Sequence, residues 1–231
     1  MNGKKSTFRS IKNAVIQATE NIRMGKVTFE DEEMEETTDS SDLSYDCWEL
    51  WMVTQDDTAP MVDRDEAAAQ LIDKAKKGDR YAQYLIGRLY QDGPVLIPDG
   101  VEARYWFDQA ARQGHVSAQY GLGKLLLSDD PEVRDTELAI QWLEYATHHG
   151  SDLAAYRLGK EYFKGEIVKR DITKAAKYLT QSAEAGNQYA QYALGKLYLD
   201  KQDGEQAHYW FTQSAAQGNE YAQFFLDRWD D

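Results

Sequence analysis

Residues 186–199 read Gly-Asn-Gln-Tyr-Ala-Gln-Tyr-Ala-Leu-Gly-Lys-Leu-Tyr-Leu, and most of the chain repeats this pattern. The second glycine of the stretch, Gly195, recurs every 36 residues as Gly87, Gly123 and Gly159. The first glycine, Gly186, is preceded at the same spacing by Gly78, Gly114 and Gly150. It is followed 32 residues later by Gly218. A period in the thirties is typical of stacked repeat proteins. The sequence therefore predicts an array of similar units.

Each unit is predicted to contain two helices. The first helix follows the glycine, as in residues 187–199, and the second runs from an aspartate to the next glycine. A short carboxylate caps a helix N-terminus, and glycine ends a helix because it adopts the left-handed conformation without strain. Three of the aspartates are followed by Glu66, Glu102 or Gln206, which predicts a capping box. The predicted N-caps are Asp63, Asp99, Asp135, Asp171 and Asp203.

The repeated pattern is Gly-x-x-x-Ala-Gln-Tyr-x-Leu-Gly-x-x-Tyr, a turn, and Asp-x-x-x-Ala-x-x-Trp-Phe-x-x-Ala-Ala-x-x-Gly. This pattern resembles Sel1-like repeats, which are related to tetratricopeptide repeats. The resemblance implies an all-α fold, a right-handed α-solenoid of stacked helix-turn-helix repeats over residues 63–231, and a role as a protein-binding scaffold. Units are expected to start near 78, 114, 150 and 186, with a terminal helix from 219. The sequence also resembles the repeat-rich C-terminal tails of mobilisation relaxases from Gram-positive conjugative elements.

Composition limits the alternatives. The single cysteine, Cys47, excludes a disulfide framework and a thiolate metal cluster within the chain. No stretch approaches the roughly 18 consecutive apolar residues of a membrane span, and we expect a cytoplasmic bacterial protein. The net charge of −14 is uneven: residues 1–26 carry +5, residues 27–66 carry −14, and the remainder carries −5. This distribution argues against nucleic-acid binding by the whole molecule.

Three segments precede the repeats. Residues 1–26 are predicted to form a basic amphipathic helix, because apolar residues recur at helical spacing in Phe8, Ile11, Val15, Ala18 and Ile22. Such a helix packs on the solenoid or a partner helix, lies on a membrane, or contacts nucleic acid. Residues 27–42 are predicted to be an acidic disordered linker, because they have little apolar surface to bury. Residues 43–62 are apolar and predict an N-terminal cap segment.

No residue pattern indicates catalysis or a cofactor. Motifs such as Gly-x-Ser-x-Gly and His-Glu-x-x-His are absent, so we expect no enzyme. The four histidines, His115, His148, His149 and His208, lack further ligands at metal-binding spacing, so we expect no metal site. Cys47 has no basic neighbour in sequence and is expected to be buried.

The candidate binding site lies on the first helices. Each carries an aromatic residue and a cation four positions later, and residues at this spacing share a helix face. By analogy with tetratricopeptide repeats, these faces would form a concave groove for a protein or peptide ligand, expected to be acidic. Alternatively, the tyrosines pack between helices and the cations are solvated. The candidate pairs are Tyr84 and Arg88, Tyr120 and Lys124, Tyr156 and Lys160, Tyr192 and Lys196, and Phe224 and Arg228.

Two further hypotheses follow from charge. The acidic residues 30–42 would occupy the basic positions of the groove until a partner displaces them. The alternative function is an accessory or tail segment of a conjugative mobilisation relaxase, in which the basic residues 1–26 contact DNA. Salt-dependent DNA binding that is lost on removing residues 1–26 would favour this alternative.

Overall fold

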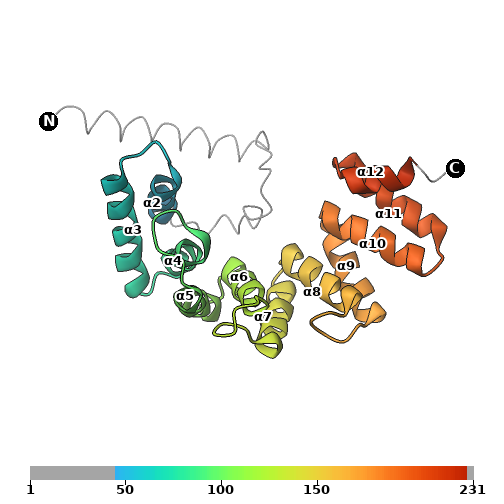
Figure 1. The fold of residues 1–231 in the computed structure, drawn as a ribbon, viewed down its shortest axis with the longest axis horizontal. Helices are drawn as coiled ribbons and strands as arrows, with labels where there is room; N and C mark the ends of the chain where they lie inside the picture. Colours follow the sequence, from blue (N-terminus) through green and yellow to red (C-terminus); the bar gives the residue numbers. More distant parts are fainter. Residues whose placement is uncertain (1–44, 228–231) are drawn as a thin grey trace. The chain divides into compact units, whose positions relative to one another are not determined.

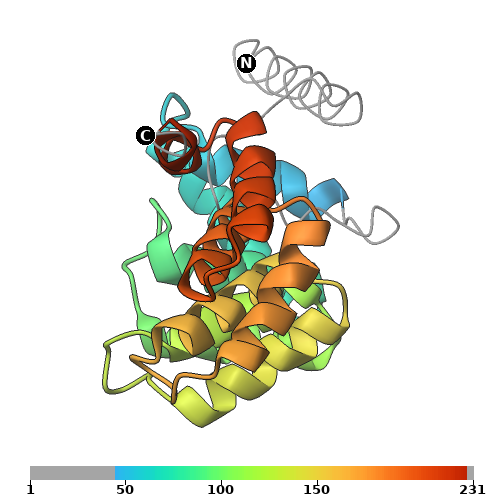
Figure 2. The same ribbon diagram turned by 90° about the vertical axis from the view of Figure 1, so that its right-hand side faces the viewer.

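The computed structural model describes residues 45–227, and within this range the chain is entirely helical (Figures 1 and 2). Residues 45–227 contain eleven helices, α2 to α12, which are connected by short turns. They form two compact units, the first ending at Ala110 and the second beginning at Ala111. The fold is an α-solenoid of helix-turn-helix repeats, as the sequence predicts. The expected helix 1–26 and linker 27–42 lie outside the described residues, as does Arg228.

The first unit contains two helix pairs. Helix α2 packs on both α3 and α4, and α3 packs on α4. Cys47 and Trp51 of α2 are buried in a core with Leu71, Ile86 and other apolar residues. The burial of Cys47 was expected from the sequence. The helices are α2 (Tyr45–Gln55), α3 (Met61–Lys76), α4 (Arg80–Asp92) and α5 (Gly100–Arg112), the last two residues of which belong to the second unit.

The second unit continues the alternation of first and second helices. Each helix packs on the next, and the first helices α6, α8 and α10 also contact one another in sequence. Figure 1 shows these helices from yellow-green to red. They are α6 (Val116–Leu126), α7 (Thr136–His148), α8 (Asp152–Lys164), α9 (Ile172–Glu184), α10 (Gln188–Asp200), α11 (Gly204–Ala216) and α12 (Glu220–Leu226).

The turn glycines and most aspartate caps have the predicted roles. The five turn glycines have φ between 83° and 98°, a conformation that favours glycine. Asp99, Asp135, Asp171 and Asp203 accept hydrogen bonds from backbone N–H groups of the following turn. The prediction for Asp63 is wrong, because α3 begins at Met61, directly after Pro60.

The predicted capping boxes do not form. The backbone N–H of Asp99 donates to the carbonyl of Tyr90, and that of Asp203 donates to the carbonyl of Tyr198. The cap N–H groups are therefore already satisfied by the preceding first helix. Glu102 instead accepts a hydrogen bond from Trp106 Nε1 at 3.2 Å.

The second glycine of each repeat permits close packing between the two helices of a unit. A Cβ atom on Gly123 would lie 2.6 Å from Leu143 Cγ, and one on Gly195 would lie 2.7 Å from Phe211 Cε1. Gly87 and Gly159 make the same approach to Phe107 and Leu179, respectively. Because these contacts leave no room for a methyl group, glycine is required on steric grounds at this position.

The principal core residue of each second helix follows the repeated aromatic position. Phe107 is 1 % exposed, and Leu143, Leu179 and Phe211 are fully buried. The aromatic residues at the preceding position are Trp106, Trp142, Tyr178 and Trp210. Trp106 and Tyr178 are buried, whereas Trp142 and Trp210 are only half-buried.

Buried glutamines connect consecutive repeats. Gln119 Nε2 donates to the carbonyl of Ala111 at 3.2 Å, and Gln191 Nε2 donates to that of Ala183 at 3.1 Å. Gln83 makes the equivalent hydrogen bond at the start of α4. Helix α8 has Ala155 at this position, and the corresponding carbonyl, that of Thr147, accepts a hydrogen bond from Gln181 instead.

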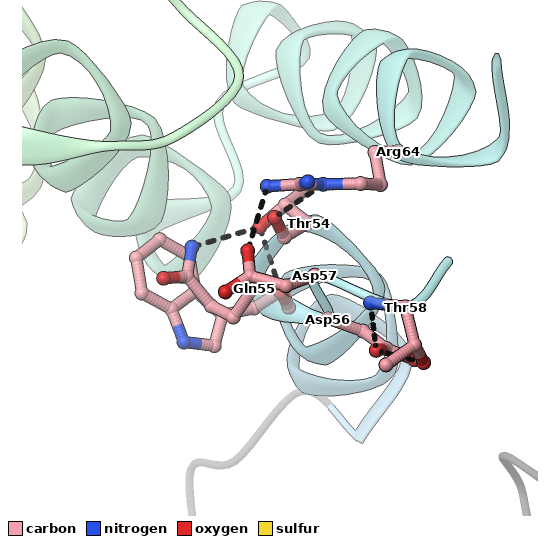
Figure 3. Close-up of polar contacts among 7 residues, drawn as sticks. Thr54, Gln55, Asp56, Asp57, Thr58 and Arg64 are labelled. Atoms are coloured by element: carbon pink, nitrogen blue, oxygen red, sulfur yellow. Dashed lines mark hydrogen bonds and ion pairs between the residues drawn. The ribbon is translucent and has the colours of Figure 1, made fainter. Parts of the chain in front are cut away.

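Polar contacts hold the turn between α2 and α3 (Figure 3). Arg64 of α3 donates from Nε to the carbonyl of Thr54 at 3.2 Å and lies 3.7 Å from Asp57. Asp56 accepts hydrogen bonds from the backbone N–H and the hydroxyl of Thr58. These hydrogen bonds lower the pKa of Asp56. They fix the connection that brings Trp51 into the core of the first unit.

Candidate interaction surface

In the second unit, tyrosines of consecutive first helices contact one another. The ring centroids of Tyr156 on α8 and Tyr189 on α10 are 6.3 Å apart. Those of Tyr192 on α10 and Tyr221 on α12 are 6.0 Å apart. Each contact joins the candidate tyrosine of one repeat to the tyrosine near the start of the next first helix. A series of aromatic side chains therefore runs across three helices.

Lysines lie over two of these rings. Lys160 Nζ is 5.8 Å from the ring centroid of Tyr156, and Lys196 Nζ is 5.7 Å from that of Tyr192. Both distances are within the range of cation–π attraction. Tyr189, Tyr221 and Lys196 are exposed, and the other members are half-buried. We call this set the Tyr–Lys face: Tyr156, Lys160, Tyr189, Tyr192, Lys196 and Tyr221.

Tyr192 also anchors the face to the core. Its ring lies 5.9 Å from the ring of Phe211 and 6.2 Å from that of Phe225. Burial raises its pKa, and the neighbouring Tyr221 raises it further. The hydroxyl therefore stays neutral at physiological pH. Tyr192 thus packs against the core and also contacts Tyr221 on the surface. Both interpretations from the sequence, packing between helices and exposure in a groove, therefore apply to this residue.

In the first unit, the equivalent pair contacts the interior. The ring of Tyr84 lies 6.1 Å from that of Phe107, and the guanidinium of Arg88 lies 4.8 Å from the ring centroid of Trp51. Trp51 is 4 % exposed and comes from α2, outside the repeated pattern. The role of Arg88 here includes packing against the N-terminal helix pair.

The remaining candidates differ in exposure. Tyr120 and Lys124 on α6 are half-buried. Phe224 on α12 is 52 % exposed, and its ring meets that of Phe225 edge-on at 6.1 Å. These positions belong to the predicted pattern of aromatic and basic residues.

Helices α7, α8 and α9 share a polar network that the repeat pattern did not predict. Tyr178 on α9 donates to Glu144 on α7 at 3.0 Å, and its ring stacks on that of Tyr162 on α8. Lys174 Nζ lies 3.3 Å from the Tyr162 hydroxyl. Burial, followed by the hydrogen bond to Glu144, raises the pKa of Tyr178 to about 12. The network joins three consecutive helices. Its only sequence signal is a tyrosine where other repeats have tryptophan.

The described residues contain no arrangement suited to metal binding or to thiol chemistry. No group of three His, Cys, Asp or Glu side chains is placed to hold a metal ion within residues 45–227. His148 and His149 each contact the carbonyl four residues earlier through Nδ1, at 2.6 and 2.8 Å. Cys47 is buried, with Sγ 3.8 Å from an Asp79 carboxylate oxygen.

None of the helices in residues 45–227 has the length and apolar character needed to cross a bilayer.

Comparison with solved structures shows repeat proteins of the same kind. A protective antigen of uropathogenic Escherichia coli that displays an SLR fold matches with 30 % identity and a TM-score of 0.69, over 78 % of this chain and 40 % of that one. A Sel1 repeat protein from Oxalobacter formigenes matches with 28 % identity and a TM-score of 0.65, over 79 % and 54 %. The chain thus spans about half or less of these two proteins.

A third structure supports the fold alone. A putative sel1 repeat protein from Klebsiella pneumoniae matches with 22 % identity and a TM-score of 0.52, over 80 % of this chain and 92 % of that one. No curated protein matches the chain.

The Sel1 repeat family matches four consecutive segments: residues 80–115, 116–151, 152–187 and 188–219. These segments cover more than half of the chain, and each begins at or next to a first helix of the structure. The chain therefore belongs to the Sel1 repeat family.

Proposed function

We propose that this protein is a non-enzymatic interaction scaffold that binds an acidic segment of a partner protein on the Tyr–Lys face. Sel1 repeats generally mediate protein–protein interaction, and their fold is typically a non-enzymatic scaffold. The observation that supports this particular face is the pair of tyrosine contacts between repeats, each with a lysine over one ring.

The chemistry of the face fits an extended acidic ligand. Tyrosines supply contact area at low cost in conformational entropy. The two lysines provide ammonium groups for carboxylates, and attraction between opposite charges speeds association and favours acidic partners. At the three sequence positions that define the face, the first helices α6, α8 and α10 carry no acidic residue. A ligand with regularly spaced carboxylates would therefore contact successive repeats without charge repulsion at these positions.

A peptide titration tests this proposal. The probe is a fluorescein-labelled octaglutamate peptide, followed by fluorescence polarisation at low salt, with octaglutamine as the uncharged comparison. We expect wild type to bind octaglutamate more tightly than octaglutamine. The Lys160→Glu/Lys196→Glu variant should lose about tenfold or more in affinity, which corresponds to about 1.4 kcal/mol.

A control with the same net charge makes the test specific. Lys169→Glu/Lys177→Glu changes two exposed lysines of the same unit that lie outside the Tyr–Lys face. We expect this variant to retain most of the affinity. Equal losses in the two double variants would show that only total charge matters, and absence of binding by wild type would refute the acidic ligand.

The alternative function is an accessory or tail segment of a mobilisation relaxase that contacts DNA through residues 1–26. Its support is the net charge of +5 in that segment. Binding of duplex DNA that weakens steeply with salt, and that disappears when residues 1–26 are removed, would favour it. DNA binding that persists after this truncation would contradict it.

A further inference from the structure

Helix α8 differs from the other first helices at two positions four residues apart. It carries Arg157 and Glu161, two residues with opposite charges. Every other complete first helix has small or apolar residues at these positions: Leu85 and Leu89 in α4, Gly121 and Leu125 in α6, and Ala193 and Leu197 in α10. The two charges therefore occur together in one repeat and are missing together in the others.

The two side chains form a largely buried ion pair. Arg157 Nε lies 3.0 Å from Glu161 Oε1. The side chain of Glu161 is 4 % exposed, as expected for a position where Leu89 and Leu197 are fully buried. Its other carboxylate oxygen, Oε2, is buried and accepts no hydrogen bond from any described residue. The Glu161 carboxylate is therefore buried with an ion-pair partner at Oε1 and no hydrogen bond at Oε2.

Stability does not explain this pair. Removing two charges from water costs more than their mutual attraction returns unless hydrogen bonds complete the site, and well-packed apolar residues are often as stable or more stable. Ala193 and Leu197 in α10 show that the same fold accommodates apolar residues at these two positions. The pair is therefore better explained by what it does to Arg157 than by what it adds to folding.

Glu161 holds a guanidinium at the border of the Tyr–Lys face. Arg157 follows Tyr156 directly and lies about 60° around the helix from Lys160, given 3.6 residues per turn. Its side chain is 26 % exposed although Nε is buried. Nε lies 3.0 Å from Glu161 Oε1 without forming a hydrogen bond, and neither Nη1 nor Nη2 has a hydrogen-bond partner among residues 45–227. The ion-pair contact at Nε therefore leaves the two terminal nitrogens for a ligand.

Resting on the proposed function, we propose that Arg157 is the residue of the third repeat that recognises a ligand carboxylate, and that Glu161 positions it. The two terminal N–H groups of a guanidinium match a carboxylate in a bidentate arrangement. Lys160 supplies a second cation on the same helix. An acidic partner would therefore place one of its carboxylates at α8, beside Tyr156, rather than equally at every repeat.

The test replaces the pair with the residues that α10 already uses. Arg157→Ala/Glu161→Leu removes one positive and one negative charge, so the net charge stays the same. We expect its melting temperature to rise by a few degrees while its affinity for octaglutamate falls about tenfold. A purely structural role would not combine higher stability with weaker binding.

A conservative variant tests the bidentate geometry. Arg157→Lys keeps the charge but has a single ammonium group in place of the planar fork. We expect it to lose several-fold in affinity for octaglutamate. Binding equal to wild type by either variant would overturn this inference and leave the proposed function standing. Absence of octaglutamate binding by wild type would overturn both.

Discussion

At the residue scale, Gly123 and Gly121 lie two positions apart on α6 but have different surroundings. A methyl group on Gly123 would meet Leu143 Cγ at 2.6 Å. Gly121 is half-buried, and its counterpart in α10 is Ala193. The steric requirement applies to Gly123, whereas the repeat accepts alanine at the position of Gly121 in α10.

Substitution of each glycine by alanine should have opposite effects. We expect Gly123→Ala to lower the free energy of unfolding by about 1–3 kcal/mol, because overpacking forces neighbouring atoms to shift. Gly121→Ala should raise it by about 0.5–1 kcal/mol, because alanine is favoured over glycine within a helix. Urea unfolding monitored by circular dichroism measures both. A change of the same sign for the two variants would contradict the packing role assigned to Gly123.

Ionisation of Tyr178 is expected to lower the free energy of unfolding at alkaline pH. Burial and the hydrogen bond to Glu144 raise its pKa from 10.0 to about 12. The folded state therefore holds the proton more tightly than the unfolded state, so this contribution is complete below pH 10 and is lost as pH rises towards 12. Tyr178→Phe removes the titrating group. We expect the difference in unfolding midpoint between wild type and Tyr178→Phe to shrink between pH 10 and 12, and a constant difference would refute this linkage.

At the element scale, a buried glutamine connects α4, α6 and α10 each to the helix before it. Gln119 is fully buried and donates to the carbonyl of Ala111. Gln223 has the same position in α12, but it is exposed and donates to Asp227. The two residues therefore form a matched pair in which only the buried one connects consecutive helices.

Replacing each glutamine by alanine should lower the free energy of unfolding more at the buried Gln119 than at the exposed Gln223. We expect Gln119→Ala to cost about 0.5–1.5 kcal/mol, because the carbonyl of Ala111 loses one of its two donors and keeps the backbone N–H of Gly114. Gln223→Ala should change the free energy of unfolding by less than about 0.5 kcal/mol, as for most surface substitutions. Thermal unfolding compares the two. Equal costs would show that the hydrogen bond to Ala111 is not the source of the stabilisation.

The repeat period predicted the helix pairs, the turn glycines and four of the five aspartate caps. It did so because these features depend on local backbone geometry. The capping boxes were wrong because the N–H groups of Asp99 and Asp203 bond to carbonyls of the preceding helix, which is a tertiary contact. The cap at Asp63 was wrong because Pro60 allows α3 to begin earlier. Local sequence cannot show that a backbone N–H group donates its hydrogen bond to a residue of another helix.

At the scale of the whole molecule, the sequence predicts which helices carry the candidate surface but not the contacts between its side chains. The aromatic and basic positions followed from alignment of the repeats. The contacts of Tyr156 with Tyr189 and of Arg88 with Trp51 depend on how helices stack, and Trp51 comes from outside the repeats. Arg157 and Glu161 were visible in the sequence as a departure from the repeat, but their meaning required the burial of Glu161.

We expect an acidic ligand to contact the Tyr–Lys face and not the α8–α9 connection or α9, which carry Lys169 and Lys177. Lysine acetylation read by mass spectrometry tests this expectation most directly, because each lysine of the wild-type chain is measured separately with and without saturating octaglutamate. We predict that the ligand protects Lys160 and Lys196 from acetylation while Lys169 and Lys177 remain as reactive as before. Protection of Lys169 and Lys177 with Lys160 and Lys196 unchanged, or equal protection of all four, would contradict the account.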